Sequence, residues 1–567
     1  MKKARTMVAM LFALLMVFCF VGCGDQSSGD EADIVITNGL VYTADGEGTT
    51  AEAVAVKGDE IVYVGDAAGA EEMTGNDTRV IDMEGGMVTP GFIDSHQHPY
   101  AMAEMMFSAP LYECETAQDY LDEVEKYIKD NPDADKIVAI GFEKPIFDKI
   151  SPTKETLDKI SKDLPIIMFD SGEHASLLNT KALEEIGFLS DDLETEQGET
   201  IEKDENGELT GWIMDSERVY GYSSSFTAEQ MEEALLAYQD EALSYGLTTT
   251  FEDAPGNFDS TMEAYKKLAG EDKLKYRVNA YMRIEPGDDA DKDIEKLKKY
   301  RDEFSEGQVQ VNGAKIFIDG ALEAGTAYMK EPYANDPKNY GTYTWEGKTD
   351  ELNEICKTLE SEDLNYHFHA IGDAAVTQAL DSIEYAKADA TDSKTRPGIT
   401  HLQFVSPEDV QRFADLDVTA AIQAFWAVYD EYYDQAVDYL GKERADVQYP
   451  IQSFFDAGVR VASGSDYPVQ TDRPLEAIHE GVNRAYPDDD HMLPPEAEKA
   501  TVEEMLQSYT LNGAIANFRE DEIGTIEVGK KADLVVLNKN LLEIDPEKIA
   551  KVKEMFTIFN GEVVYEK

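Results

Sequence analysis

Short segments in which hydrophobic and polar residues alternate occupy both ends of the chain. Near the start they lie at residues 33–36, 53–56, 60–64 and 79–81. Alternation with a period of two is typical of half-buried β-strands, because successive side chains of a strand point to opposite faces. The same pattern returns at 532–537 and 561–565. We therefore predict a small β-sandwich domain built from both termini, with its N-terminal part at 33–88 and its C-terminal part at 523–567.

The middle of the chain has a different pattern, in which each apolar run of strand length is followed by an amphipathic helical stretch. Eight such runs begin at Met87, Leu247, Tyr276, Val309, Tyr366, Ile399, Val418 and Val459. Alternating strands and helices are typical of a parallel sheet, and eight strands close a (β/α)8 barrel. We predict an α/β fold with a TIM-like barrel over 89–522. The segment of about 100–245, after the first barrel strand, is too long for a loop and predicts an α/β insertion over the barrel mouth.

The first residues have the pattern of an export signal. A basic start precedes an apolar run from Met7 to Val21, which is too short for a comfortable membrane span. The run resembles a bacterial lipoprotein signal, in which residues 1–22 are removed, Cys23 becomes the lipid-modified first residue and residues 23–32 form a tether. An ordinary secretory signal is the alternative. We expect an exported protein, either lipid-anchored on the outward face of the cell membrane or secreted.

Acidic residues dominate the composition, with 115 Asp and Glu against 50 Lys and Arg and a formal net charge of −65 over 567 residues. Such a surface repels nucleic acid and anionic lipid, so we expect no nucleic-acid partner and membrane contact only through the lipid anchor. Cys114 and Cys356 are the cysteines that remain once the signal segment and Cys23 are set aside. A disulfide between them is compatible with the sequence but not indicated by it. The sequence leaves open whether the chain forms a homodimer.

The strongest chemical signal is the run GGMVTPGFIDSHQHP at the first predicted barrel strand. His96 and His98 are separated by one residue, so on a strand they point to the same side and can bind one cation. Imidazole is a common ligand of zinc and related metals. Two unrelated histidines in a surface loop are the alternative, but the chain has only 8 histidines, which makes this spacing informative.

Further residues that suit a metal lie near the C-terminal ends of other predicted barrel strands, where a barrel brings side chains together. They are Lys315 in the fourth strand, His367 and His369 in the fifth, His401 in the sixth and Asp466 in the eighth. Each one alone is weak support, because a single histidine in a strand is more often a core residue. The ordered set on five strands predicts a centre for divalent metal, of one or two ions and most simply Zn²⁺.

This ordered set resembles the amidohydrolase superfamily of metal-dependent hydrolases, and in particular its YtcJ-like branch, which includes N-substituted formamide deformylases. The resemblance extends from about Asp33 to the C-terminus and is carried by VNGAKIFIDGAL, HAIGDAAV, ITHLQFVSPEDV, VASGSDYPV and DEIGTIEVGKKADLVVLNKN. It implies a more buried metal held by His96, His98 and Asp466, and a more exposed one held by His369 and His401.

The resemblance also implies that Lys315 bridges the two metals after its amine has become a carbamate, since a buried lysine can be neutral and nucleophilic. A salt bridge between Lys315 and Asp319, or a one-metal site with a free lysine, is the alternative. Between the two histidines of the fifth strand, the motif favours His369 as the ligand, which leaves His367 a supporting or packing role.

Such a centre is expected to activate water for attack on an amide carbonyl, with Asp466 as general base and then as general acid toward the departing amine. We predict an enzyme, a metal-dependent amidohydrolase that cleaves a carbon–nitrogen bond of a small amide-type molecule. His174 is expected to orient the substrate or stabilise the oxyanion, or else to cap the helix that follows it. A solute-binding lipoprotein, or an inactive barrel that binds a ligand without turnover, is the alternative function.

The remaining candidates have weaker signals. His479 and His491 lie in an acidic stretch rich in Pro and Asp, so we expect both at the surface. Phe425, Trp426 and Tyr467 follow predicted strands next to the metal ligands, so they either line an apolar substrate pocket or belong to the core.

Overall fold

The structure is a computed structural model, and it describes residues 31–567 with short gaps. The gaps are residues 113, 171–174, 191–192, 194, 196–198, 215, 305–306, 389 and 391–392. The predicted signal segment, Cys23 and most of the tether therefore lie outside the described residues, and so does His174. In the part of the chain that the structure describes, no helix combines the length and apolar character needed to cross a membrane.

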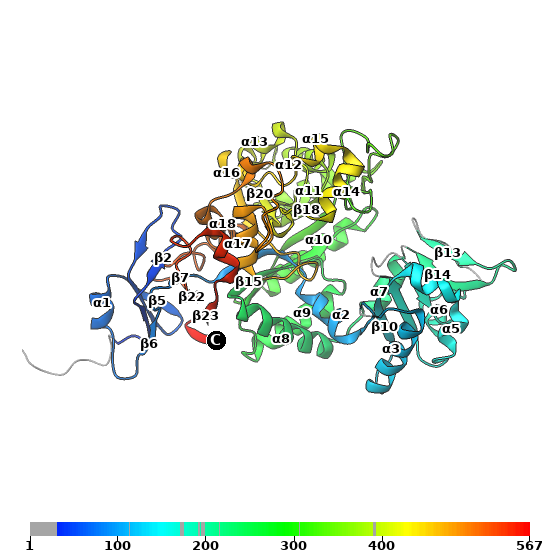
Figure 1. Ribbon diagram of the computed structural model, residues 1–567, viewed down its shortest axis with the longest axis horizontal. Helices are drawn as coiled ribbons and strands as arrows, with labels where there is room; N and C mark the ends of the chain where they lie inside the picture. Colours follow the sequence, from blue (N-terminus) through cyan, green and yellow to red (C-terminus); the bar gives the residue numbers. More distant parts are fainter. Residues whose placement is uncertain are drawn as a thin grey trace, which may run out of the picture.

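Eight parallel strands form a nearly closed barrel in the middle of the molecule (Figure 1). Their order in space follows the sequence: β8 (Phe92–Gln97), β15 (Leu247–Asp253), β16 (Arg277–Arg283), β17 (Val309–Phe317), β18 (Asn365–Ala370), β19 (Gly398–His401), β20 (Thr419–Ile422) and β21 (Arg460–Ser463). The ring closes where the chain beyond β21 meets β8, with the Asp466 N–H donating to the His96 carbonyl at 2.8 Å. The predicted barrel is confirmed.

The first barrel strand begins later than predicted. The run that starts at Met87 contains two strands, because β7 (Met87–Pro90) pairs with β22 of the terminal domain and only β8 belongs to the barrel. Gly91 separates them at a close approach, since a Cβ there would lie 2.2 Å from Thr248 Oγ1. Every residue of both strands is buried. The apolar pattern therefore runs across the break, and the domain boundary falls at Gly91 rather than after residue 88.

Helices follow the barrel strands and cover the barrel from outside. They are α9 (Phe258–Gly270), α10 (Ala290–Glu303), α11 (Thr349–Ser361), α12 (Asp373–Lys387), α13 (Pro407–Asp415), α14 (Glu431–Leu440), α15 (Lys442–Ala445), α16 (Ile451–Asp456), α17 (Pro474–Asn483), α18 (Val502–Ser508) and α19 (Leu511–Ala516). In α12 the buried residues include Val376, Leu380 and Ile383, which lie three and four positions apart on one helical face. This apolar face is the side on which the helix packs against the barrel.

Two sheets built from both ends of the chain form the terminal β domain (Figure 1). One contains β1 (Ile34–Thr37), β4 (Ala53–Lys57), β5 (Glu60–Gly65) and β6 (Arg79–Asp82); the other contains β2 (Leu40–Tyr42), β3 (Thr50–Ala51), β7, β22 (Leu534–Leu537), β23 (Glu554–Phe559) and β24 (Glu562–Glu566). Side chains of both sheets, among them Ile36, Val54, Val88 and Val536, share one hydrophobic core.

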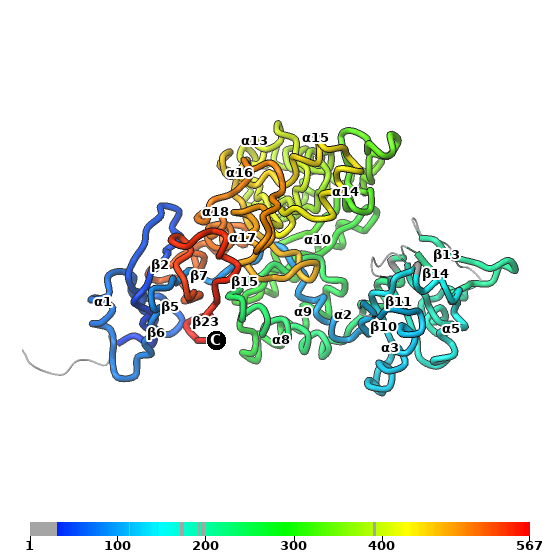
Figure 2. The backbone as a smooth tube through the Cα atoms, in the orientation of Figure 1, coloured from blue at the N-terminus to red at the C-terminus, as the bar shows by residue number. Residues whose placement is uncertain are grey.

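The insertion after β8 is a separate α/β subdomain, which lies beside the barrel (Figure 2). Its sheet has the order β13 (Thr200–Lys203), β14 (Leu209–Met214), β12 (Ala175–Leu178), β11 (Ile166–Asp170), β10 (Ile137–Phe142) and β9 (Ala109–Pro110). Helices α3 (Ala117–Asp130), α4 (Lys144–Phe147), α5 (Lys154–Asp158), α6 (Thr180–Ile186) and α7 (Glu217–Ser223) accompany it.

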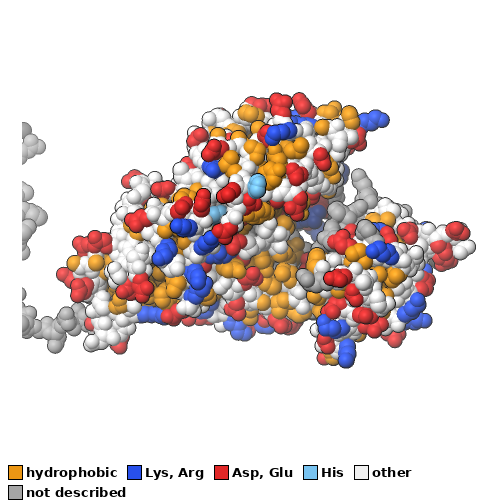
Figure 3. Space-filling view, viewed as in Figure 1, with side chains coloured by type: hydrophobic (Ala, Val, Ile, Leu, Met, Phe, Trp, Pro, Cys, Tyr) orange, Lys and Arg blue, Asp and Glu red, His pale blue; other side chains and the backbone are white. Residues whose placement is uncertain are grey.

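The insertion is shorter than the predicted 100–245. Helices α2 (Met102–Phe107) and α8 (Ala228–Ser244) at its two ends bury Met102, Met231 and Leu235 in the main barrel core. The molecule is hollowed between the barrel and the subdomain, and Asp and Glu side chains are spread over the visible face (Figure 3).

Candidate metal centre

A buried carboxylate, Asp94, connects the end of β8 with the end of β21 through hydrogen bonds. The sequence prediction did not include this residue. Asp94 accepts hydrogen bonds from the backbone N–H of His96 at 3.0 Å and of Ser465 at 3.1 Å. Burial raises the pKa of Asp94 to about 7. The signal was available, because Asp94 stands inside the apolar run that precedes His96. The side chain fixes the two strand ends that carry the predicted ligands His96, His98 and Asp466.

His96, His98 and Asp466 converge as the sequence predicted. Asp466 Oδ1 lies 3.0 Å from His96 Nε2 and 3.2 Å from His98 Nε2. The other ring nitrogen of His98, Nδ1, lies 2.6 Å from the backbone carbonyl of Asp253. Donation of the Nδ1–H to this carbonyl makes Nε2 the ring nitrogen that faces Asp466, and metal-binding histidines are commonly held by Nδ1 in this way.

The charges in this group support one another. Burial would raise the pKa of Asp466, but hydrogen bonds from His96 and His98 hold it well below its ordinary value. Burial would lower the pKa of His98, but the hydrogen bond and charge of Asp466 raise it. Asp466 is therefore a carboxylate at neutral pH, as a metal ligand or a general base must be.

Lys315 reaches the same centre from β17, next to a second carboxylate that sequence reasoning missed. Lys315 Nζ lies 2.6 Å from Asp253 Oδ2, and His96 Nδ1 lies 2.7 Å from the same oxygen. Burial lowers the pKa of Lys315, against the opposing charge of Asp253. Asp253 is the last residue of β15. An acidic residue at the C-terminal end of a barrel strand was a signal that could have found it.

The predicted alternative of a salt bridge between Lys315 and Asp319 is wrong. Asp319 instead accepts backbone hydrogen bonds from Tyr328 at 2.9 Å, Ile371 at 3.0 Å and Gly372 at 2.8 Å. Its Oδ1 also lies 3.2 Å from His369 Nδ1. Asp319 therefore positions the loop that follows β18 and lies beside His369 of that strand, rather than pairing with the lysine.

His401 and His369 form the other side of the centre. The ring of His401 lies 4.4 Å from the ring of His369 and 5.0 Å from the ring of His96. His401 Nδ1 is 3.1 Å from Gln423 Oε1, and the Gln423 amide nitrogen donates to Thr400 Oγ1 at 3.2 Å. The second contact orients the amide, so that its oxygen accepts the His401 Nδ1–H and leaves Nε2 free as a ligand.

His367 is also at the centre, below His369 on β18. Ligand atoms of His96, Asp253 and His367 lie within 4.8 Å of one another, as do those of His96, His98 and Asp466. Among the described residues, neither His367 Nε2 nor Asp253 Oδ1 has a hydrogen-bond partner, although both are buried. Burial holds the pKa of His367 well below its ordinary value, so the ring is neutral. The structure thus brings both histidines of β18 to the centre.

Backbone strain and close packing accompany the predicted ligands. His401 and Asp466 have φ angles of 77° and 61°, in the left-handed region that residues with a Cβ rarely adopt. Such conformations are concentrated at functional sites, where surrounding contacts enforce them. Gly464 packs against β8 so closely that a Cβ would lie 2.6 Å from the backbone nitrogen of His96. The two ligand-bearing strand ends can meet only because this residue is glycine.

The residues with weaker sequence signals lie in different surroundings. Trp426 is half-buried and stacks on His401 with ring centroids 5.4 Å apart, whereas Phe425 and Tyr467 are buried in the main core. His491 is exposed as predicted, but the surface prediction for His479 is wrong, because this residue lies on the buried face of α17. No disulfide joins Cys114 and Cys356.

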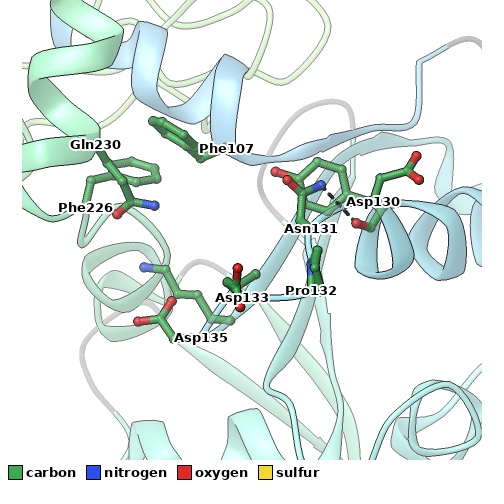
Figure 4. A pocket seen from close by; sticks show the side chains of 11 residues that line it. Phe107, Asp130, Asn131, Pro132, Asp133, Asp135, Phe226 and Gln230 are labelled. Atoms are coloured by element: carbon green, nitrogen blue, oxygen red, sulfur yellow. Dashed lines mark hydrogen bonds between the residues drawn. The ribbon is translucent and has the colours of Figure 1, made fainter.

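Two cavities differ in their relation to the metal centre. One of about 350 Å³ is at the junction of the subdomain with α2 and α8, lined by Phe107, Phe226, Gln230 and residues of 130–136 (Figure 4). None of its lining residues belongs to the metal centre. Another, of about 280 Å³, lies at the barrel mouth and includes Phe317 and Asp319, which contact His369. The second is the cavity that adjoins the metal centre.

The fold and the donor set define a (β/α)8-barrel protein with a cluster of metal-compatible side chains at the C-terminal ends of its strands. A family model described as "Amidohydrolase family" matches residues 79–565. The chain therefore belongs to the amidohydrolase family.

Relatives extend over nearly the whole chain. It is 28% identical over 537 residues to the putative amidohydrolase YtcJ of Bacillus subtilis, with 93% of this chain and 98% of that protein covered. It is 26% identical over 563 residues to the N-substituted formamide deformylase of Arthrobacter pascens, with coverage of 94% and 98%. An uncharacterized metal-dependent hydrolase from Pyrococcus horikoshii has the same fold, with a TM-score of 0.73, 22% identity and coverage of 90% and 99%.

Proposed function

We propose that this protein is a metal-dependent hydrolase that cleaves a carbon–nitrogen bond of a small amide-type molecule. The observation that carries the proposal is the convergence of His96, His98, His401, Lys315 and Asp466 from the ends of four barrel strands onto one buried centre. The similarity to N-substituted formamide deformylase supports the choice of an amide substrate.

The donor set fits divalent metal. His98 and His401 each direct Nδ1 toward an oxygen, which leaves Nε2 as a ligand atom, and His367 Nε2 and Asp253 Oδ1 are buried polar atoms without a hydrogen-bond partner in the described structure. In our proposal His96, His98 and Asp466 hold one ion, and His369 and His401 hold a second. Zn²⁺ is the simplest choice for these ligands, and when bound it would supply a Lewis acid and lower the pKa of water.

Lys315 would join the two ions as a carbamate. Lys315 is 1% exposed, and burial lowers its pKa. A larger fraction of this amine is therefore neutral, and able to take up carbon dioxide, than for a surface lysine. Carboxylation would also require Lys315 to release Asp253, which then keeps its contact with His96. Mass spectrometry of the intact metal-loaded protein tests this step.

Asp466 is the group we assign to proton transfer. It is a carboxylate held at the strand end by two histidines, and its position at the mouth allows it to accept a proton from water and return it to the departing amine. The return matters because an amide otherwise expels a very poor leaving anion. Trp426, stacked on His401, offers an apolar wall for the acyl or amine group of the substrate.

We also propose that the mature protein begins at Cys23 and is held by lipid on the outward face of the cell membrane. The basic start, the short apolar run and Gly22-Cys23 support this location. Labelling of cells with a palmitate analogue should mark the wild-type protein and leave the Cys23→Ala variant unmarked. Equal labelling of both would overturn the anchor and leave the secreted alternative.

The enzymatic proposal is tested by metal analysis of unchelated protein together with hydrolysis of N-formyl and N-acetyl amines. Asp466→Asn should lower turnover at least about hundredfold. The matched control is Asp415→Asn at the exposed end of α13, which should keep wild-type activity. A protein that contains no metal and hydrolyses no amide after metal loading would contradict the proposal. A barrel that binds amides but is unaffected by Asp466→Asn would be a binding protein instead.

A further inference from the structure

An arginine of β16, Arg283, lies at the mouth of the barrel beside the metal centre. Arg283 is the last residue of β16, and it is the only exposed position of a strand that is otherwise buried. In the parallel pairing of β16 with β17, Arg283 is opposite Lys315. The same register that places Lys315 in the centre therefore places a permanently charged guanidinium at the same level of the neighbouring strand.

One aromatic ring connects the guanidinium with the centre. Arg283 Cζ lies 4.8 Å from the ring centroid of Phe317, and Lys315 Nζ lies 5.3 Å from the same centroid. The Phe317 ring also stacks on His369, with centroids 5.1 Å apart and planes at 28°. A molecule whose amide lies at the metal centre can therefore extend past Phe317 to reach Arg283.

The cavity at this place is suited to a polar end of such a molecule. It has a volume of about 280 Å³, and besides Arg283 its wall includes Gly320 and the hydroxyl side chains of Thr326, Thr342 and Thr344. Two acidic side chains also line it. Asp319 is occupied by three backbone N–H groups, whereas Glu285 is 40% exposed and forms an ion pair with Arg283. The ion pair with Glu285 thus shows that the Arg283 guanidinium can bind a carboxylate at this position.

We propose that the substrates carry a carboxylate beyond the scissile amide, as in N-acyl amino acids, and that Arg283 binds this group in place of Glu285. The inference rests on the proposed amidohydrolase function and names its substrate class. The guanidinium fork matches a carboxylate with two parallel hydrogen bonds, and the Phe317 ring holds its plane. An exposed Glu285 loses little when it is displaced, because a surface ion pair contributes little stability.

The experiment compares each carboxylate with its neutral carboxamide. The probes are N-acetylglycine, N-acetyl-4-aminobutyrate and N-acetyl-6-aminohexanoate, each paired with its terminal carboxamide. The three acids differ in the length of the spacer between amide and carboxylate, so their kcat/KM values show which spacer length reaches Arg283 best. Wild-type protein should cleave at least one carboxylate with a higher kcat/KM than its amide. Arg283→Gln should raise KM for that carboxylate by about tenfold to hundredfold, with kcat and the amide nearly unchanged.

Two further variants separate recognition from structure. Glu285→Gln removes the competing carboxylate, so it should lower KM for the acid and leave the amide as it was. Arg301→Gln on α10 makes the same charge change outside the cavity and should leave both substrates at wild-type values. A role of Arg283 in folding alone would instead change acid and amide equally, and Glu285→Gln would then not improve the acid.

Each outcome decides between the two proposals. Equal rates for acids and amides in the wild type, or an Arg283→Gln variant that loses both equally, would overturn the inference while the amidohydrolase function stands. If no amide of either kind is hydrolysed, the proposed function fails. Calorimetric binding of the three acids to wild type and Arg283→Gln then still tests the inference, and equal affinities would overturn it.

Discussion

Replacing Gly464 by alanine tests whether the ends of β8 and β21 form the metal centre. A Cβ on residue 464 would lie 2.6 Å from the backbone nitrogen of His96 and 2.7 Å from His96 Cβ. Carbon contacts are favourable near 3.5–4.0 Å, so one strand end must move by about 1 Å. His96 has little freedom to yield, because its ring lies 2.7 Å from Asp253 on one side and 3.0 Å from Asp466 on the other.

The expected cost has two parts. Overpacking of a buried contact costs about 1–3 kcal/mol of unfolding free energy, which thermal unfolding of the chelated protein measures. Displacement of His96 relative to Asp466 should weaken Zn²⁺ binding at least about tenfold to hundredfold, which titration against a coloured chelator measures.

The matched control is Gly270→Ala at the end of α9, where a Cβ would have no neighbour within 4 Å among the described residues. This variant should bind Zn²⁺ as the wild type does and be equally or slightly more stable, because alanine restricts the unfolded chain. If Gly464→Ala has the unfolding free energy and the Zn²⁺ affinity of the wild type, the proposed close contact between the ends of β8 and β21 is refuted.

Three further predictions concern residues around the centre and the subdomain. Gln423→Leu removes the acceptor for His401 Nδ1, so Zn²⁺ should bind about tenfold to hundredfold more weakly in the same titration; an unchanged affinity would remove Gln423 from metal binding. Burial raises the pKa of Glu480 to about 9, so the folded state keeps a proton that the unfolded state releases, and this contribution to stability is lost as pH rises from about 4.5 to 9. Glu480→Gln should therefore gain stability relative to wild type between pH 5 and pH 8, by about 1–3 kcal/mol, and melting curves that shift equally at both pH values would contradict this. Lys136→Met removes hydrogen bonds to three backbone carbonyls of 222–225, at the end of α7 and the start of the connection to α8, so limited proteolysis should cut this segment faster while barrel unfolding is unchanged; wild-type cleavage rates would contradict this role of Lys136.

Much of the fold could be predicted from local patterns. Each of the eight barrel strands is a short apolar run followed by an amphipathic helix, and both features depend only on neighbouring residues. The pattern did not show where β7 ends and β8 begins, because both strands are completely buried and no polar residue separates them. It also extended the insertion into α2 and α8, whose amphipathic faces pack on the barrel rather than on the subdomain.

The candidate site was predictable in part. The histidines, Lys315 and Asp466 were found because metal ligands are restricted to few residue types and a barrel gathers its strand ends. His479 was misplaced because its acidic sequence neighbours suggested a surface, whereas its own helical face is buried. Asp253 and Gln423 were missed, since their roles depend on partners in other strands.

The sequence by itself determined which chemical groups are available and on which strand each is carried. Tertiary structure alone decided which of them are in contact: Asp253 lies between Lys315 and His96, Gln423 supports His401, and Phe317 contacts both Arg283 and the centre. The physical reason is that hydrophobic periodicity reports which face of a strand is buried. The relative stagger of neighbouring strands is set by packing around the whole ring, and it leaves no signal in any single strand.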